Sequence, residues 1–147
     1  MAMDTTVVVS VIAAASSVIV TAVSFYLTKK KEREADWRKY KYEQYKELLL
    51  SMSEVTGINP TLEGRRGFAK ACNSLHLIGS TGVLVALHHL QDEIKGLNTN
   101  KSVAKHDALL SKLIWEIRKD INIPGTPEVN EFSVHLVAAP TINESGR

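Results

Sequence analysis

The chain has 147 residues, of which 18 are Lys or Arg and 16 are Asp or Glu, so its formal net charge is +2. This length allows one small folded domain beside the apolar segment described below, and it excludes a multidomain enzyme. The single cysteine, Cys72, excludes a disulfide-stapled scaffold, and the mixed composition excludes collagen-like and low-complexity chains.

An uncharged, mostly apolar run occupies residues 5–28. As a helix it would extend roughly 35 Å, which is enough to cross a hydrocarbon core of about 30 Å. No basic residue precedes the run and Phe25, Tyr26 and Leu27 close it, unlike a cleaved secretory signal. A buried core helix is the alternative, but it would normally be shorter and carry a polar face. We therefore predict that residues 5–28 form a transmembrane helix.

The charges on the two sides of this run are unequal. Only Asp4 precedes it, whereas residues 29–41 carry seven basic and three acidic side chains. Because basic flanks favour the cytoplasmic side, we predict a single-pass protein of the inner (plasma) membrane, with residues 1–4 outside and the helical domain in the cytoplasm. Its partners would be the lipid bilayer and anionic headgroups, contacted at the membrane surface by Lys29, Lys30, Lys31 and Arg33.

Residues 29–41 have a second interpretation, a nucleic-acid patch. Their mixed signs and their position beside the predicted membrane helix favour the lipid interpretation, so we do not expect nucleic acid as a partner. Ala14, Ser17 and Thr21 fall on one face of the membrane helix and are compatible with a homo-oligomer formed through it, although no GxxxG pattern is present.

Apolar residues recur at helical spacing in four later segments, at about 36–55, 62–78, 81–97 and 102–121. Thr61 and Ser80 are suited to be N-caps of the second and third. The sequence therefore predicts an all-α fold, with one N-terminal transmembrane helix followed by an antiparallel helical bundle of about four helices. The predicted inward residues are Trp37, Tyr40, Tyr45, Leu48, Leu49, Met52 and Val55; Phe68, Ala71, Cys72, Leu75 and Ile78; Val83, Leu84, Leu87, Leu90, Ile94 and Leu97; and Val103, Leu110, Leu113, Ile114, Ile117 and Ile121.

The helical domain is expected to span residues 36–123, leaving a tail at 124–147. Phe132, Val134 and Leu136 alternate with polar residues, which suits one extended strand, but a lone strand makes no sheet. We expect the tail to lie along the bundle, to pair with another chain or to be disordered. Asp120 sits near a helix C-terminus, where cations are favoured, so it needs a specific partner in its own turn or on a neighbouring helix.

His88 and His89 are the best metal-binding candidates, because Glu93 follows His89 by one helical turn. This makes half a metal site, since a full site needs three or four converging ligands. Surface histidines paired with carboxylates are the more ordinary interpretation, so we expect no metal; a metal enzyme built on these three residues is a remote third hypothesis. Cys72 is expected to be buried and unreactive.

Arg65, Arg66 and Lys70 form the best anion-binding cluster, on the first turns of the second predicted helix. A solvated helix face is the alternative interpretation. P-loop, GxGxxG, GxSxG and zinc-finger spacings are all missing from the sequence. We therefore expect no catalysis and no cofactor.

Two short motifs add a resemblance to this pattern. The first is the Ser-capped run Ser80-Thr81-Gly82-Val83-Leu84, and the second is Ile117-Arg118-Lys119-Asp120-Ile121. With the N-terminal transmembrane helix, they resemble a group of small bacterial membrane-anchored helical proteins of uncharacterised function, whose last helix ends in an Arg-Lys-Asp signature. Here Ile117 replaces a methionine and Asn122 a glycine of that signature. The resemblance covers residues 5–123 and implies no catalytic residues.

The sequence as a whole thus predicts a membrane-anchored helical module for protein–protein interaction, with a protein partner that the sequence does not identify. The alternative is a ligand-gated membrane effector, whose cytoplasmic bundle senses an anionic small molecule or a nucleotide near Arg65, Arg66 and Lys70.

Overall fold

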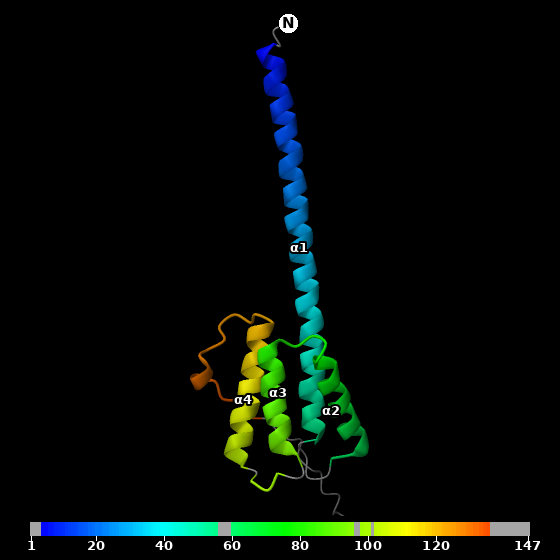
Figure 1. The fold of residues 1–147 in the computed structure, drawn as a ribbon, viewed down its shortest axis with the longest axis vertical. Helices are drawn as coiled ribbons and strands as arrows, with labels where there is room; N and C mark the ends of the chain where they lie inside the picture. Colours follow the sequence, from blue (N-terminus) through cyan, green and yellow to red (C-terminus); the bar gives the residue numbers. More distant parts are fainter. Residues whose placement is uncertain (1–3, 56–59, 96–97, 101, 136–147) are drawn as a thin grey trace, which may run out of the picture. The chain divides into compact units, whose positions relative to one another are not determined.

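The computed structural model of the chain describes residues 4–55, 60–95, 98–100 and 102–135. The secondary structure of this described part is helical, so the fold is all-α, as the sequence predicts (Figure 1). The elements are α1 (Thr5–Val55), α2 (Leu62–Leu75), α3 (Thr81–Ile94), α4 (Val103–Asp120) and the short 3-10 helix η1 (Val129–Glu131). The chain divides into two compact units, residues 1–39 and 40–147.

The first unit is the N-terminal part of α1. Its large apolar side chains from Val7 to Leu27 are about half to two-thirds exposed, apart from the partly exposed Val8, and none of its most apolar 18-residue stretch is buried. The hydroxyls of Ser10, Ser17 and Thr21 donate to backbone carbonyls three or four residues earlier, at 2.8–2.9 Å. These three hydroxyls are therefore satisfied within the helix itself.

The second unit is a bundle of the C-terminal part of α1 with α2, α3 and α4, in which successive helices run in opposite directions (Figure 1). Its core is continuous and draws on every helix, because apolar residues recur three or four positions apart on each. The core residues are Tyr45, Leu48, Met52, Ala71, Cys72, Leu75, Ile78, Val83, Ala86, Leu87, Leu90, Leu110, Leu113 and Ile117.

Side-chain caps begin two of the helices, as predicted. The hydroxyl of Thr61 accepts from the backbone N–H of Gly64 at 3.0 Å, and Ser80 accepts from Val83 at 3.5 Å. The second helix is shorter than predicted, because α2 ends at Leu75 and the chain tightens into a turn closed by Gly79 donating to the Leu75 carbonyl at 2.7 Å. Ile78 is nevertheless buried, at 9% exposure.

Four predicted core residues lie outside the core, and one of them is Val55, the partly exposed last residue of α1. Trp37 and Tyr40 are about half exposed, because burial on α1 begins only at Tyr45, one to two turns later. Val103 is 79% exposed, since it is the first residue of α4 and the first buried position of that helix is Leu110. Leu97 falls outside the described residues.

The chain after α4 turns at Asn122, whose φ of 55° lies in the left-handed region that favours Gly and Asn at helix ends. It then lies against α4, where the Trp115 indole N–H donates to the Pro127 carbonyl at 2.8 Å. The structure contains no strand within the described part of the tail, which ends at residue 135; Leu136, the last position of the predicted alternation, lies beyond it.

Candidate functional site

The N-terminal part of α1 is one candidate functional element. It is the one helix among the described residues that is long and apolar enough to cross a membrane. Its charge-free stretch ends at Thr28, and the basic segment follows at once. Within that segment Lys29 pairs with Glu32 at 2.7 Å and lies 6.0 Å from the centre of the Phe25 ring, while Lys30 approaches Glu34 at 4.0 Å. Lys31 and Arg33 are exposed.

These pairs reduce the local positive charge only in part. Exposed ion pairs of this kind contribute little and exchange readily with solvent, so all four basic side chains remain available to a negatively charged surface. A pair with Glu32 raises the pKa of Lys29, which keeps that ammonium group charged throughout the physiological range.

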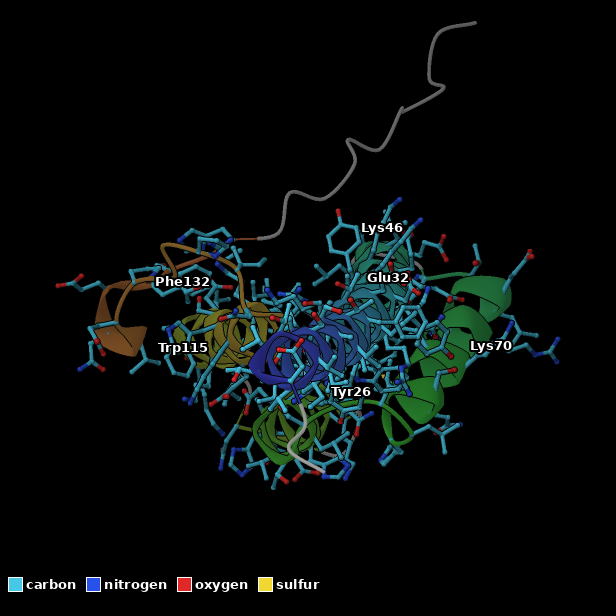
Figure 2. All side chains as sticks on the ribbon, turned by 90° about the horizontal axis from the view of Figure 1, so that it is seen from above. Tyr26, Glu32, Lys46, Lys70, Trp115 and Phe132 are labelled. Atoms are coloured by element: carbon cyan, nitrogen blue, oxygen red, sulfur yellow. The ribbon has the colours of Figure 1, made fainter. Side chains whose placement is uncertain are left out.

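Arg65, Arg66 and Lys70 are exposed on α2. Figure 2 shows Lys70 on the opposite side of the bundle from Trp115 and Phe132. The N-terminus of α2 is already capped by Thr61, carries Glu63 in its first turn and lies against Glu54 near Gly64. These two carboxylates and the cap oppose an anion there, so a solvated face explains this cluster better than a ligand site.

The predicted metal candidates His88, His89 and Glu93 do not converge. His88 and His89 are exposed on successive residues of α3, whereas the Glu93 side chain is buried. Among the residues that the structure describes, no group of three or more His, Cys, Asp or Glu side chains is placed to hold a metal ion.

Glu93 instead joins α3 to α4. Its carboxylate accepts from the Lys105 ammonium at 2.6 Å, from the Ser102 backbone N–H at 3.1 Å and from the Asn98 amide at 3.1 Å. These donors, with Lys105 first, lower the pKa of Glu93. The Glu93 carboxylate thus satisfies the backbone N–H of Ser102, the N-cap residue of α4, whose own side chain makes no capping hydrogen bond.

His88 contacts a residue that the sequence did not group with it. Its Nε2 lies 3.1 Å from Nε2 of His76, the residue that follows α2. The two ring centres are 5.3 Å apart and the rings are tilted by 34°. The Nδ1 of His76 is 3.1 Å from the backbone carbonyl of Cys72, which fixes the ring. Residue spacing alone did not indicate this pair, because it joins two helices across a turn.

Asp120 has its partners on a neighbouring helix, which is one of the two alternatives that the sequence left open. Its carboxylate accepts from the ammonium of Lys41 at 2.8 and 3.0 Å and from the hydroxyl of Tyr45, both on α1. Both charged side chains are nearly removed from solvent. The cluster fastens the end of α4 to α1.

A groove of about 510 Å³ lies between α4 and the tail. Asp107 on its wall is 3.0 Å from the His135 imidazole and 3.3 Å from that of His106, and these hydrogen bonds lower the pKa of Asp107, with His106 contributing most. Lys112 lies on the same wall. Because carboxylate and basic groups alternate here, the groove has no clear preference for an anion or a cation.

Cys72 is buried, at 2% exposure, as the sequence predicts. Burial raises the pKa of its thiol, so the reactive thiolate form is disfavoured. This residue is a core side chain, and its backbone carbonyl, not its sulfur, contacts His76.

Comparison of the chain with protein-family models, with curated proteins and with solved structures found no match.

Proposed function

We propose that this protein is a single-pass inner-membrane protein whose cytoplasmic helical domain is an interaction module. Residues 5–28 would cross the bilayer with the N-terminus outside. The observation that carries the proposal is the uncharged stretch of α1, whose large apolar side chains are exposed apart from the partly exposed Val8. Each buried Val, Leu, Ile or Phe gains roughly 1.5–3 kcal/mol over an exposed one, so such a helix strongly favours an apolar surrounding.

The proposed orientation depends on the basic residues after this stretch. Lys29, Lys30, Lys31 and Arg33 would lie in the headgroup region of the cytoplasmic leaflet, where each basic side chain near an anionic surface contributes about 1 kcal/mol. The partners we propose are therefore the bilayer, its anionic lipids, a cytoplasmic protein and a second copy of the chain.

An interaction role is favoured over catalysis by the use that the fold makes of its polar residues. Asp120 is occupied by Lys41 and Tyr45, and Glu93 by Lys105 and the Ser102 backbone. These well-formed clusters hold helices together and have no carboxylate left to act on a substrate. The same architecture supports the proposed likeness to small bacterial membrane-anchored helical proteins.

The test is a topology assay on the full chain. A C-terminal green fluorescent protein should fluoresce, a C-terminal alkaline phosphatase should be inactive, and the chain should stay in carbonate-washed membranes. In a variant in which Lys29, Lys30, Lys31 and Arg33 become Asn and two Lys residues replace Thr5 and Thr6, we expect the orientation to invert.

The control replaces Lys46 and Lys70, two exposed basic residues of the bundle, by Asn and should keep the original orientation. Extraction of the native chain by carbonate would overturn the membrane-anchored function. An active phosphatase fusion of the native chain would overturn its cytoplasmic orientation.

A further inference from the structure

Two histidines from different helices meet at the exposed surface of the bundle. The Nε2 atoms of His76 and His88 are 3.1 Å apart. Both residues are solvent-exposed, so an ion can reach them. Neither histidine takes part in the clusters around Asp120 and Glu93.

The tautomer of His76 follows from its other contact. A backbone carbonyl only accepts hydrogen bonds, so the Cys72 carbonyl at 3.1 Å requires the proton of a neutral His76 to be on Nδ1. The Nε2 lone pair of His76 is then directed at His88. A backbone carbonyl that holds the far nitrogen of an imidazole is the usual outer support of a histidine metal ligand.

The separation of the two nitrogens fits one bound ion. Nitrogen ligands lie about 2.0–2.1 Å from Zn²⁺, so two nitrogens 3.1 Å apart subtend about 100° at the ion. This angle lies between those of octahedral and tetrahedral coordination. An ion would take the place of the proton that the two rings share in its absence.

The surroundings also favour a cation. Asp92 lies one helical turn after His88, and the electrostatic influence of His89 and His88 on its carboxylate contributes to the low pKa of Asp92, after the larger effect of its pairing with Lys95. A carboxylate near the rings lowers the cost of placing positive charge between them.

We propose that His76 and His88 form a two-histidine site for a divalent late transition metal, Zn²⁺, Ni²⁺ or Cu²⁺, with water in the remaining positions. Imidazole nitrogen suits these ions, whereas Mg²⁺ and Ca²⁺ require oxygen ligands. Because one ligand follows α2 and the other is on α3, the bound ion fastens the turn between these helices and stabilises the folded bundle.

The test uses the full chain, free of any histidine tag, in mild detergent micelles. Zn²⁺, Ni²⁺ and Cu²⁺ are titrated separately against a chromophoric chelator, and Mg²⁺ is the negative control. We expect one ion per chain, a rise in thermal stability with added ion, and affinity in the order Cu²⁺ above Ni²⁺ and Zn²⁺. His76→Gln and His88→Gln should each weaken binding by about tenfold or more.

His89→Gln is the matched control, because His89 is exposed on the same helix and adjoins His88. It should bind Zn²⁺ as the native chain does. Native affinity in His76→Gln, an equal loss in His89→Gln, or one ion per two chains would each overturn the two-histidine site.

A second measurement on the native chain avoids any effect of substitution on folding. Diethyl pyrocarbonate modifies accessible imidazoles, and the modified residues are identified by mass spectrometry. Zn²⁺ should protect His76 and His88 and leave His89 reactive. Equal reactivity of His76 with and without Zn²⁺ would also overturn the proposal.

Discussion

The carboxylate of Asp120, the last residue of α4, lies 2.8 Å from the ammonium nitrogen of Lys41 on α1. The hydroxyl of Tyr45, one turn after Lys41, donates to the same carboxylate. Burial, and then the hydrogen bond to Asp120, raise the pKa of Tyr45, so its hydroxyl remains a donor across the neutral range. A short polar cluster therefore joins the first and last helices of the bundle.

Removing the Asp120 carboxylate should destabilise the bundle strongly. The side chains of Lys41 and Asp120 are only 13% and 10% exposed, so Asp120→Ala removes the carboxylate that neutralises a largely buried ammonium group. We expect a loss of about 2–4 kcal/mol in the free energy of unfolding. Urea unfolding in detergent micelles, followed by tryptophan fluorescence, measures this loss.

Asp92→Ala is the control for this prediction, because Asp92 pairs with Lys95 at the exposed surface. Its cost should stay below about 1 kcal/mol. The double variant Lys41→Met, Asp120→Leu should lose less than Asp120→Ala alone, since both members of the charged pair are replaced by apolar side chains. Equal losses in the Asp92 and Asp120 variants would contradict a buried pair.

The need of Asp120 for a partner could be predicted from its place near a helix end, but the partner could not. The Thr61 and Ser80 caps follow from local signals and were predicted correctly, whereas the end of the second helix and the burial of Trp37 were not. Lys41 lies 79 residues before Asp120, and only the packing of α1 on α4 brings the two together. Local patterns do not specify such long-range contacts.

The histidines also show that local sequence patterns do not specify contacts between helices. Helical spacing grouped His88 with His89 and Glu93, because neighbours one turn apart share a face. In the fold, the buried Glu93 side chain pairs with Lys105, and His88 contacts His76 across the turn between two helices. Position along one helix gave a candidate residue, and the turn geometry determined its actual neighbour.

Glu93 should make the stability of the bundle depend on acid pH. Its pKa in the folded chain is below the ordinary value of 4.5, so the unfolded chain binds its proton more readily. The stabilisation by this carboxylate is therefore complete above about pH 4.5 and is lost as the pH falls through the folded pKa. Unfolding free energies measured from pH 6 to pH 3 test this dependence.

In Glu93→Gln this part of the acid dependence should disappear, and the variant should already be less stable than the native chain at neutral pH. Glu43→Gln, at an exposed carboxylate that approaches Lys46 at 3.8 Å, is the control and should keep the native dependence. Parallel pH profiles for the native chain and Glu93→Gln would show that Glu93 has no such role.

Substitution by alanine should change the stability of the bundle differently at two glycines of α2. A Cβ at Gly67 would meet only the Glu54 carboxylate among the described atoms, at an ordinary contact distance of 3.9 Å. Gly67→Ala should therefore stabilise the bundle by about 0.5–1 kcal/mol through helix propensity. At Gly64 a Cβ would lie 3.2 Å from Glu54 Cβ and 3.3 Å from the capping oxygen of Thr61, so Gly64→Ala should bring no gain. Thermal unfolding of the two variants compares them directly, and a larger gain at Gly64 would contradict the packing of α1 against α2.

The tail should be released from α4 by a single substitution. The hydroxyl of Ser111 accepts from the backbone N–H of Val134 at 2.9 Å and donates to its carbonyl at 3.3 Å, and Ser111 is 7% exposed. Ser111→Ala removes both bonds, at a cost of about 1–2 kcal/mol to local docking. Chymotrypsin should then cleave after Phe132 about tenfold faster, because cleavage follows the population of the opened tail.

Ser74→Ala, which removes a hydroxyl that bonds to the Lys70 carbonyl within α2, should leave that rate unchanged. Equal cleavage of the native chain and Ser111→Ala would mean that these two bonds do not hold the tail.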